Sequence, residues 1–377
     1  MFHLLARALI VLLLGICALP ALAAIPAAER QTLIDLYISA RGDVWRNNTG
    51  WKTAGGFSPA GTECGWHGVK CDAGQTRVER IRLGNNQLAG SLPATLSHLK
   101  ALTVFSAIDN QLTGQIPSLA GLTALREFYV GGNQLTGTIP SLTGLSALMA
   151  LDVDGNQLTG NIPSLAGLKA LQDVALSHNQ LTGHIPSLTR LTALRNFACS
   201  DNQLTGSIPA LTGLTALILF DARINQLSGN IPSLAGLTSL QWFGVDNNQL
   251  TGNIPALTGL TALESFGAGH NQFTGSIPAL TGLTALEWFS VDGNQLTGNI
   301  PSLSGLTALN DFYVDRNQLT GAPPAAPIAL KANSSRLCPN NLSAPSPTDA
   351  AWNAATGTED WHQGCVRAPF QPSGANR

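Results

Sequence analysis

Acidic side chains recur in this chain at fixed distances before a repeated asparagine. They lie six, four, two or one residue before it, and they make up half of the 22 acidic residues. Regularly spaced carboxylates can catalyse glycoside hydrolysis as a pair roughly 5 to 9 Å apart, bind a hard cation, or attract a basic partner. The residues concerned are Asp109, Glu127, Asp152, Asp154, Asp173, Asp201, Asp221, Asp246, Asp292, Asp311 and Asp315.

The elements that must position these carboxylates repeat with a nearly constant period. The tetrad Asn-Gln-Leu-Thr, or a close variant, is followed by glycine; its first interval is 24 residues and the later intervals are 23. A fixed period of this length predicts a solenoid. The asparagines are Asn86, Asn110, Asn133, Asn156, Asn179, Asn202, Asn225, Asn248, Asn271, Asn294 and Asn317.

Each repeat contains a short segment with alternating polarity. Apolar residues lie eight, five and three positions before the asparagine and two positions after it, as Leu125, Phe128, Val130 and Leu135 do around Asn133. Period two predicts a strand with Phe128 and Val130 inward, so that its neighbours Glu127, Tyr129 and Gly131 face outward. We expect the asparagine to face inward and to bond the backbone of adjacent coils, because a buried amide must be hydrogen-bonded.

After the asparagine, the pattern L-T-G-x-I-P, as in Leu158–Pro163, indicates a turn that excludes helix. Over residues 78–321 the chain resembles the plant-type leucine-rich repeat family. The resemblance implies an α/β solenoid: a right-handed leucine-rich repeat superhelix of about eleven 23–24-residue coils, with a parallel concave sheet and disulfide-linked caps. The family usually repeats every 24 residues, so the 23-residue coils lack one residue on the convex side.

We expect neither catalysis nor a bound metal or cofactor. A general acid needs a shielded carboxyl with a raised pKa, whereas an open, solvent-washed sheet offers no pocket. Asp152 and Asp154 resemble part of a calcium loop, but strand alternation turns them away from Asn156. Asp292 and Asp315 share a position in consecutive coils and could attract a cation; we expect water to relieve their repulsion instead.

The amino terminus has the pattern of a secretory signal peptide over residues 1–24. Arg7 precedes an apolar run from Ala8 to Cys17, and Ala21 to Ala23 fits a cleavage site. A lipoprotein signal at Cys17 is the weaker alternative, because the bulky Ile16 precedes it. We therefore expect a secreted, periplasmic or cell-surface protein without a later membrane span. An excess of arginine over lysine and much alanine suggest a bacterial genome.

The segments 25–77 and 322–377 are expected to cap the open ends of the solenoid. The first resembles the amino-terminal cap of plant-type leucine-rich repeat receptors and inhibitors; the second contains a predicted helix from Thr348 to Ala355. Ends about 50 Å apart allow only local cysteine pairs, which are Cys64–Cys71 and Cys338–Cys365. Cys199 lies at an inward strand position and is expected to be a buried thiol.

Outward positions vary most between coils, so binding is expected on the concave face. One patch near the carboxyl end combines aromatic and acidic groups, and a second lies nearer the amino end. Since only Arg80, Arg82, Arg223 and Arg316 oppose the acids, the face is expected to be negative; alternatively, these residues only solubilise an exposed sheet. The patches comprise Trp242, Asp246, Trp288, Asp292, Asp311, Tyr313 and Asp315, and Glu127, Tyr129, Asp152, Asp154 and Asp173.

These features favour a monomeric recognition module that binds an extracellular, basic protein or peptide. The family resemblance suggests a mimic of a host receptor or an inhibitor of an extracellular enzyme. A net charge of −2 offers no field for nucleic acid or an anionic membrane. Two alternatives stay open: glycan or cell-wall binding through the tryptophans, and ice binding through a hydroxyl row. The row is Thr113, Thr136, Thr159, Thr182, Thr205, Ser228, Thr251, Thr274, Thr297 and Thr320.

Overall fold

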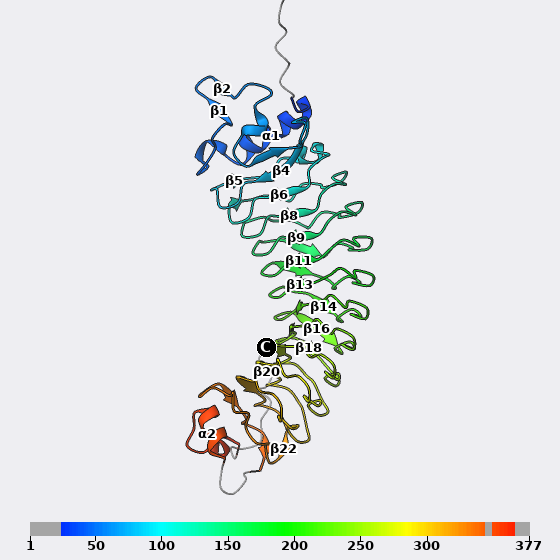
Figure 1. Cartoon of the computed structure of the whole chain (residues 1–377), viewed down its shortest axis with the longest axis vertical. Coiled ribbons are helices and arrows are strands. Elements are labelled where there is room, and N and C mark those ends of the chain that lie inside the picture. Colours follow the sequence, from blue (N-terminus) through cyan, green and yellow to red (C-terminus); the bar gives the residue numbers. More distant parts are fainter. Residues whose placement is uncertain (1–23, 344–348, 366–377) are drawn as a thin grey trace, which may run out of the picture.

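The chain folds as one elongated solenoid whose coils stack along the long axis (Figure 1). The computed structural model describes residues 24–343 and 349–365. Thirteen strands form the main sheet, and all neighbours pair in parallel except β3 and β4, which are antiparallel. In order, these strands are β3 (Val69–Cys71), β4 (Val78–Arg82), β6 (Val104–Ser106), β8 (Glu127–Tyr129), β9 (Ala150–Asp152), β11 (Asp173–Ala175), β13 (Asn196–Ala198), β15 (Leu219–Asp221), β17 (Trp242–Gly244), β19 (Ser265–Gly267), β20 (Trp288–Ser290), β21 (Asp311–Tyr313) and β23 (Ser335–Arg336).

The strand alternation expected from the sequence is confirmed. Phe128 and Val130 are buried, while Glu127 and Tyr129 are half-buried on the other side of the sheet. Phe128 pairs with Phe105 and Leu151 in the neighbouring coils, so equivalent repeat positions form continuous rows across the sheet. A residue's place in the 23-residue repeat therefore decides which residues it meets.

The asparagine of each repeat ties its coil to the preceding one. The Nδ2 of Asn156 donates to the carbonyls of Val153 and Asp154 in its own coil and to that of Val130, at 3.0 to 3.1 Å. Its Oδ1 accepts from the backbone N–H of Leu135 at 2.9 Å. The same pattern recurs along the stack, as expected. It also continues at Asn340, which adds a rung beyond the eleven asparagines of the repeat pattern.

Phenylalanine side chains form a stacked row inside the sheet. Rings in consecutive coils from Phe197 to Phe312 lie 5.5 to 5.8 Å apart, with interplanar angles of 14 to 17°. The row ends on the fully buried Trp352 of the carboxy-terminal cap, whose ring centroid lies 6.0 Å from that of Phe312. Trp352 therefore covers the apolar cross-section that the last coil would otherwise expose.

A second set of short parallel strands follows the asparagines. The repeated threonine links adjacent coils through two hydrogen bonds. The backbone N–H and the Oγ1 of Thr159 both donate to the carbonyl of Gly137 in the preceding coil, at 2.7 and 3.2 Å. Gly160 follows with φ +74°, a conformation that favours glycine. The strands are β5 (Ala89–Gly90), β7 (Gln111–Leu112), β10 (Thr159–Asn161), β12 (Gln180–Thr182), β14 (Thr205–Gly206), β16 (Gln226–Gly229), β18 (Gln249–Leu250), β22 (Thr320–Gly321) and β24 (Asn341–Leu342). The first, longer coil also contains the 3₁₀ helix η3 (Ala94–His98), which follows β5.

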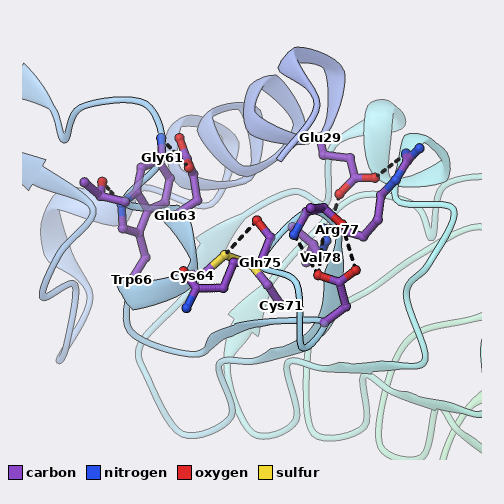
Figure 2. Close-up of a disulfide and its surroundings, with 12 residues drawn as sticks. Glu29, Gly61, Glu63, Cys64, Trp66, Cys71, Gln75, Arg77 and Val78 are labelled. Carbon is purple, nitrogen blue, oxygen red and sulfur yellow. Dashed lines mark hydrogen bonds and ion pairs between the residues drawn. A yellow bond between two sulfur atoms is a disulfide. The ribbon is translucent and has the colours of Figure 1, made fainter. Parts of the chain in front are cut away.

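The amino-terminal cap is built on helix α1 (Ala27–Ser39), which buries Leu33 and Leu36, while the buried Tyr37 packs on Trp45 and Trp51 of the cap. The buried carboxylate of Glu29 accepts from the backbone N–H of Val78 at 2.8 Å and pairs with Arg77, which docks the helix on β4 (Figure 2). The predicted Cys64–Cys71 disulfide is confirmed beside these contacts. Smaller elements are η1 (Gly42–Val44), β1 (Lys52–Thr53), β2 (Gly56–Phe57) and η2 (Glu63–Gly65).

The carboxy-terminal cap carries helix α2 (Ala350–Thr356) and the 3₁₀ helix η4 (Trp361–Gly364). The expected helix from Thr348 to Ala355 is confirmed with shifted bounds, because Asp349 caps the helix and Thr356 ends it; residue 348 lies outside the described residues. The Cys338–Cys365 disulfide is confirmed, and Cys199 is fully buried. The expected signal peptide also lies outside the described part, except for Ala24. Within residues 24–343 and 349–365, no helix is long and apolar enough to span a membrane.

Because the asparagine ladder satisfies buried backbone groups in two coils, we expect Asn156→Ala to lower the free energy of unfolding by about 2–4 kcal/mol. The exposed neighbour Gln157 provides the control, and Gln157→Ala should change stability by less than about 0.5 kcal/mol. Urea denaturation followed by circular dichroism measures both. Equal stability of the two variants would contradict a structural role for the ladder.

Candidate ligand-binding face

The main sheet places the carboxy-terminal patch on adjacent strands in one register. One row across β17, β19, β20 and β21 contains Trp242, Ser265, Trp288 and Asp311. The next row along the strands contains Gly244, Gly267, Ser290 and Tyr313. Trp288 therefore pairs with Asp311 and Tyr313 with Ser290, so the patch is one continuous surface on the sheet.

Aromatic side chains form a row across this patch, with an arginine at each end. The rings of Trp242 and Trp288 are parallel within 3°, with centroids 6.5 Å apart, and Tyr313 follows at 6.3 Å with a tilt of 52°. Arg223 lies over Trp242 at 5.3 Å and Arg336 lies over Tyr313 at 6.0 Å. The row therefore presents flat apolar surface at a fixed spacing on a rigid sheet.

Three buried glycines, Gly244, Gly267 and Gly269, form a floor beneath these side chains. A Cβ at Gly267 would overlap the carboxylate of Asp246 and lie 2.9 Å from Trp288. A Cβ at Gly244 would lie 3.1 Å from the Trp242 Nε1. The lack of side chains here lets the neighbouring tryptophan and carboxylate groups fold down onto the backbone. The repeat pattern predicts glycine at outward strand positions here, but it does not predict that these glycines form a floor.

The expectation of a fully solvent-exposed acidic strip is wrong at its centre. Asp246, Asp221 and Asp315 are only 8 %, 8 % and 4 % exposed. Asp246 Oδ1 accepts from the backbone N–H of Gly269 at 2.8 Å, while its Oδ2 has no hydrogen-bond partner among the described residues. Burial raises the pKa of Asp246 to about 6, with a further contribution from the charge of Asp292. The shielded carboxyl that an open sheet was not expected to provide is therefore present.

The neighbouring carboxylates differ in their contacts. Asp292 accepts from the Ser290 hydroxyl at 2.6 Å and lies 3.0 Å from the imidazole Nε2 of His270. Burial raises the pKa of Asp315, and the negative charge of Asp292 raises it further. The Tyr313 hydroxyl lies 3.4 Å from Asp311. Among residues 24–343 and 349–365, no group of three histidine, cysteine or acidic side chains is arranged to hold a metal ion.

Arginines neutralise part of the acidic face. Arg223 binds Asp221 through two hydrogen bonds of 2.9 Å, and Arg316 lies 3.8 Å from Asp315. Arg336 also belongs to this face, because β23 extends the sheet beyond residue 321. Our expectation of only four opposing arginines was therefore wrong, since it counted only coils that carry the repeated tetrad.

The amino-terminal patch is more weakly organised. Tyr129 pairs with Asp152 in register, and Glu127 lies 3.6 Å from Arg82. Burial raises the pKa of both Asp152 and Asp154. Asp173 lies on β11 and accepts from the Asn196 side chain at 2.6 Å. Tyr129 is the one aromatic residue of this patch, so the patch lacks the stacked row found near the carboxyl end.

Because the pKa of Asp246 is raised above the ordinary value near 3.8, protonation of this carboxyl stabilises the fold. That stabilisation is complete below about pH 4 and is lost as the pH rises through about 6. At pH 7 the buried, ionised carboxylate lowers the free energy of unfolding by up to about 3 kcal/mol. We expect Asp246→Asn to restore that free energy at pH 7 and to change stability little at pH 4. Urea denaturation at both pH values tests this. Glu264→Gln, at an exposed position in the next coil, is the control and should show no such pH-dependent gain.

Comparison with known proteins places this chain beside plant receptors. No protein-family model matches it. The receptor-like kinase TMK2 of Arabidopsis thaliana is 50% identical over 54 residues, which cover 14% of this chain and 6% of that protein. The solved structure of a TDR receptor has a TM-score of 0.67 and 31% identity, covering 72% of this chain and 48% of that chain. The plant peptide hormone receptor RGFR1 in complex with RGF2 has a TM-score of 0.60 and 32% identity, covering 69% and 47%.

A plant ice-binding protein also shares the fold, with a TM-score of 0.59 and 24% identity, covering 76% of this chain and 93% of that chain. At that identity the likeness shows the fold alone. The chain spans about half the length of the solved receptor structures and less than a tenth of the curated receptor kinases it matches. From the repeats, the asparagine ladder and these likenesses together, we conclude that the chain is a leucine-rich repeat solenoid similar to plant receptor ectodomains.

Proposed function

We propose that this protein is a secreted recognition module that binds a peptide or an extended protein segment along the concave face of its solenoid. The main contact would be the carboxy-terminal patch around Trp242, Trp288 and Tyr313. The observation that carries the proposal is the parallel aromatic row beside buried, incompletely bonded carboxylates. Large aromatic rings with few rotatable bonds are the residues that most often anchor interfaces.

The comparisons support a peptide as the ligand class. Similar solved structures include the plant peptide hormone receptor RGFR1 in complex with RGF2 and the ectodomain of the plant membrane receptor kinase GASSHO1/SCHENGEN3 in complex with CASPARIAN STRIP INTEGRITY FACTOR 2. The latter is 30% identical to this chain with a TM-score of 0.58. We infer that this chain binds the same class of ligand, through the concave face proposed above. Mimicry of a host receptor and inhibition of an extracellular enzyme are both roles that such binding could perform.

The acidic side chains would favour a basic partner. Asp246, Asp292 and Asp315 lie on one row of the face, two residues before the asparagine of their coils. Arg223 lies next to Asp246, but its guanidinium already donates to both carboxylate oxygens of Asp221. Complementary charge steers association and disfavours acidic competitors. We therefore propose a cationic partner, bound by a solenoid that acts as a monomer.

Affinity capture from extracellular fluid tests the proposal. The mature chain from Ile25 would be immobilised beside a variant carrying Trp242→Ala, Trp288→Ala and Asp292→Asn. A control variant carries Glu127→Gln and Tyr129→Ala in the amino-terminal patch. Because the anchoring rings are lost in the first variant, we expect it to lose a bound protein or peptide that the native chain and the control retain. Mass spectrometry identifies the retained material, and retention by all three chains would place the site elsewhere.

Glycan binding is the second candidate, and the parallel Trp242 and Trp288 rings favour it because flat rings at fixed spacing can stack on sugars. The two candidates differ in their dependence on salt. Binding of a basic partner by an acidic face should weaken as ionic strength rises, whereas stacking on a sugar should not. For ice binding, the threonine hydroxyls are unfavourably placed, since those of Thr113, Thr159 and Thr205 already donate to glycine carbonyls of the preceding coil.

A further inference from the structure

The aromatic row contains an asymmetry that points to a specific ligand group. Trp242 carries the guanidinium of Arg223 over its ring, and Tyr313 carries that of Arg336. Trp288, which lies between them, has no arginine or lysine of the described residues over its ring. In the first case the arginine on the aromatic face also binds a carboxylate, that of Asp221. The chain itself thus shows which group this surface accepts.

Carboxylate oxygens converge beside Trp288. The space above the Gly269 Cα, where a Cβ would lie, is 2.6 Å from Asp292 Oδ1, 3.1 Å from Ser290 Oγ and 3.2 Å from Asp246 Oδ1. The other oxygen of Asp246 lies over Gly267 next to the Trp288 ring. A donor placed above this floor would therefore meet several acceptors at once.

Unpartnered polar atoms lie on the same row of this face, two residues before the ladder asparagines. Asp246 is more than nine-tenths buried, yet its Oδ2 has no hydrogen-bond partner among the described residues, and the same holds for Asp315 Oδ1. A buried carboxylate oxygen without a donor destabilises the fold. A donor supplied by a ligand would remove that penalty, so binding energy is available at this point for a group that carries N–H donors and positive charge.

We propose that Asp246, Asp292 and Trp288, above the glycine floor, form a socket for one cationic side chain, arginine or lysine, of the bound peptide. The cation packs on the face of Trp288 and donates to Asp246 and to the oxygens above Gly269. This inference rests on the proposed function, because it assigns one recognised group of the peptide. It also gives a role to Gly244, Gly267 and Gly269, which leave room for the tryptophan and carboxylate groups above them.

The test is selection of peptides from a random phage-displayed library. The native chain, Asp246→Asn, Gly269→Ala and Glu264→Gln would be panned in parallel. Asp246→Asn keeps an oxygen for the Gly269 N–H while removing the charge, and Gly269→Ala fills the floor without changing charge. Glu264→Gln removes one exposed acid from the neighbouring coil and is the matched control. We expect the native chain and the control to enrich a cationic residue at one fixed position, and the other two variants to lose that preference.

A selected peptide then provides the quantitative measurement. Replacing its arginine by citrulline, or its lysine by norleucine, removes the charge and should weaken binding to the native chain roughly tenfold or more. Asp246→Asn should weaken binding of the charged peptide by a similar factor and make the protein insensitive to the exchange, because the two changes remove the same interaction. Calorimetric titration measures all four combinations. Whether arginine or lysine is enriched identifies which cation the socket holds.

The outcomes separate this inference from the proposed function. Enriched peptides without a cationic position, or a cationic preference that Asp246→Asn retains, would overturn the socket and leave peptide recognition intact. A native chain that enriches no peptide above background would overturn peptide recognition and the socket with it. Circular dichroism of each variant confirms that the fold is intact before binding is compared.

Discussion

Each coil of this solenoid is held to the preceding one by the hydrogen bonds of a single asparagine side chain. The amide donates to carbonyls of two coils and accepts from the N–H of the leucine two residues beyond the previous asparagine, as Asn156 does with Leu135. A strand of three residues has few ladder hydrogen bonds of its own. The rest of the stack, including the phenylalanine row and the threonine bonds, depends on the register that this amide fixes.

Because the register is fixed, the length of the repeat determines which outward residues of adjacent coils lie side by side. Because every coil from Asn110 onward has 23 residues, position six before the asparagine always meets position six of the next coil. Trp242 and Trp288 are therefore separated by the single coil that contains Ser265, and their rings become parallel without any direct backbone link. The proposed binding face is thus rigid because the scaffold beneath it is regular, and such rigidity would lower the entropic cost of ordering side chains on binding.

Most of the fold could be predicted from the sequence, because period, alternation and turn residues are local signals. The inward positions of Phe128 and Asn133 and the pairing of Trp288 with Asp311 follow from counting along the repeat, and both disulfides follow from the distance between the two ends of the stack. The burial of Asp246 could not be obtained in this way. That burial depends on side chains from the coils on both sides and on the glycines beneath them. These contacts join different coils and cannot be read from a single repeat. Arg336 was missed because its coil lacks the tetrad by which coils were recognised.

The buried carboxylates of the face are difficult to explain as part of the scaffold. Asp246 does not contribute to the asparagine ladder, and its raised pKa means that it destabilises the fold at neutral pH. A neutral serine at this position would avoid that penalty, and other coils have one there, for example Ser177 and Ser200. Local penalties that the fold does not require are typical of positions that serve a ligand. On the proposed function, the stability lost at Asp246 and its unpartnered oxygen have one cause: the coil leaves open a hydrogen bond that the proposed ligand would complete.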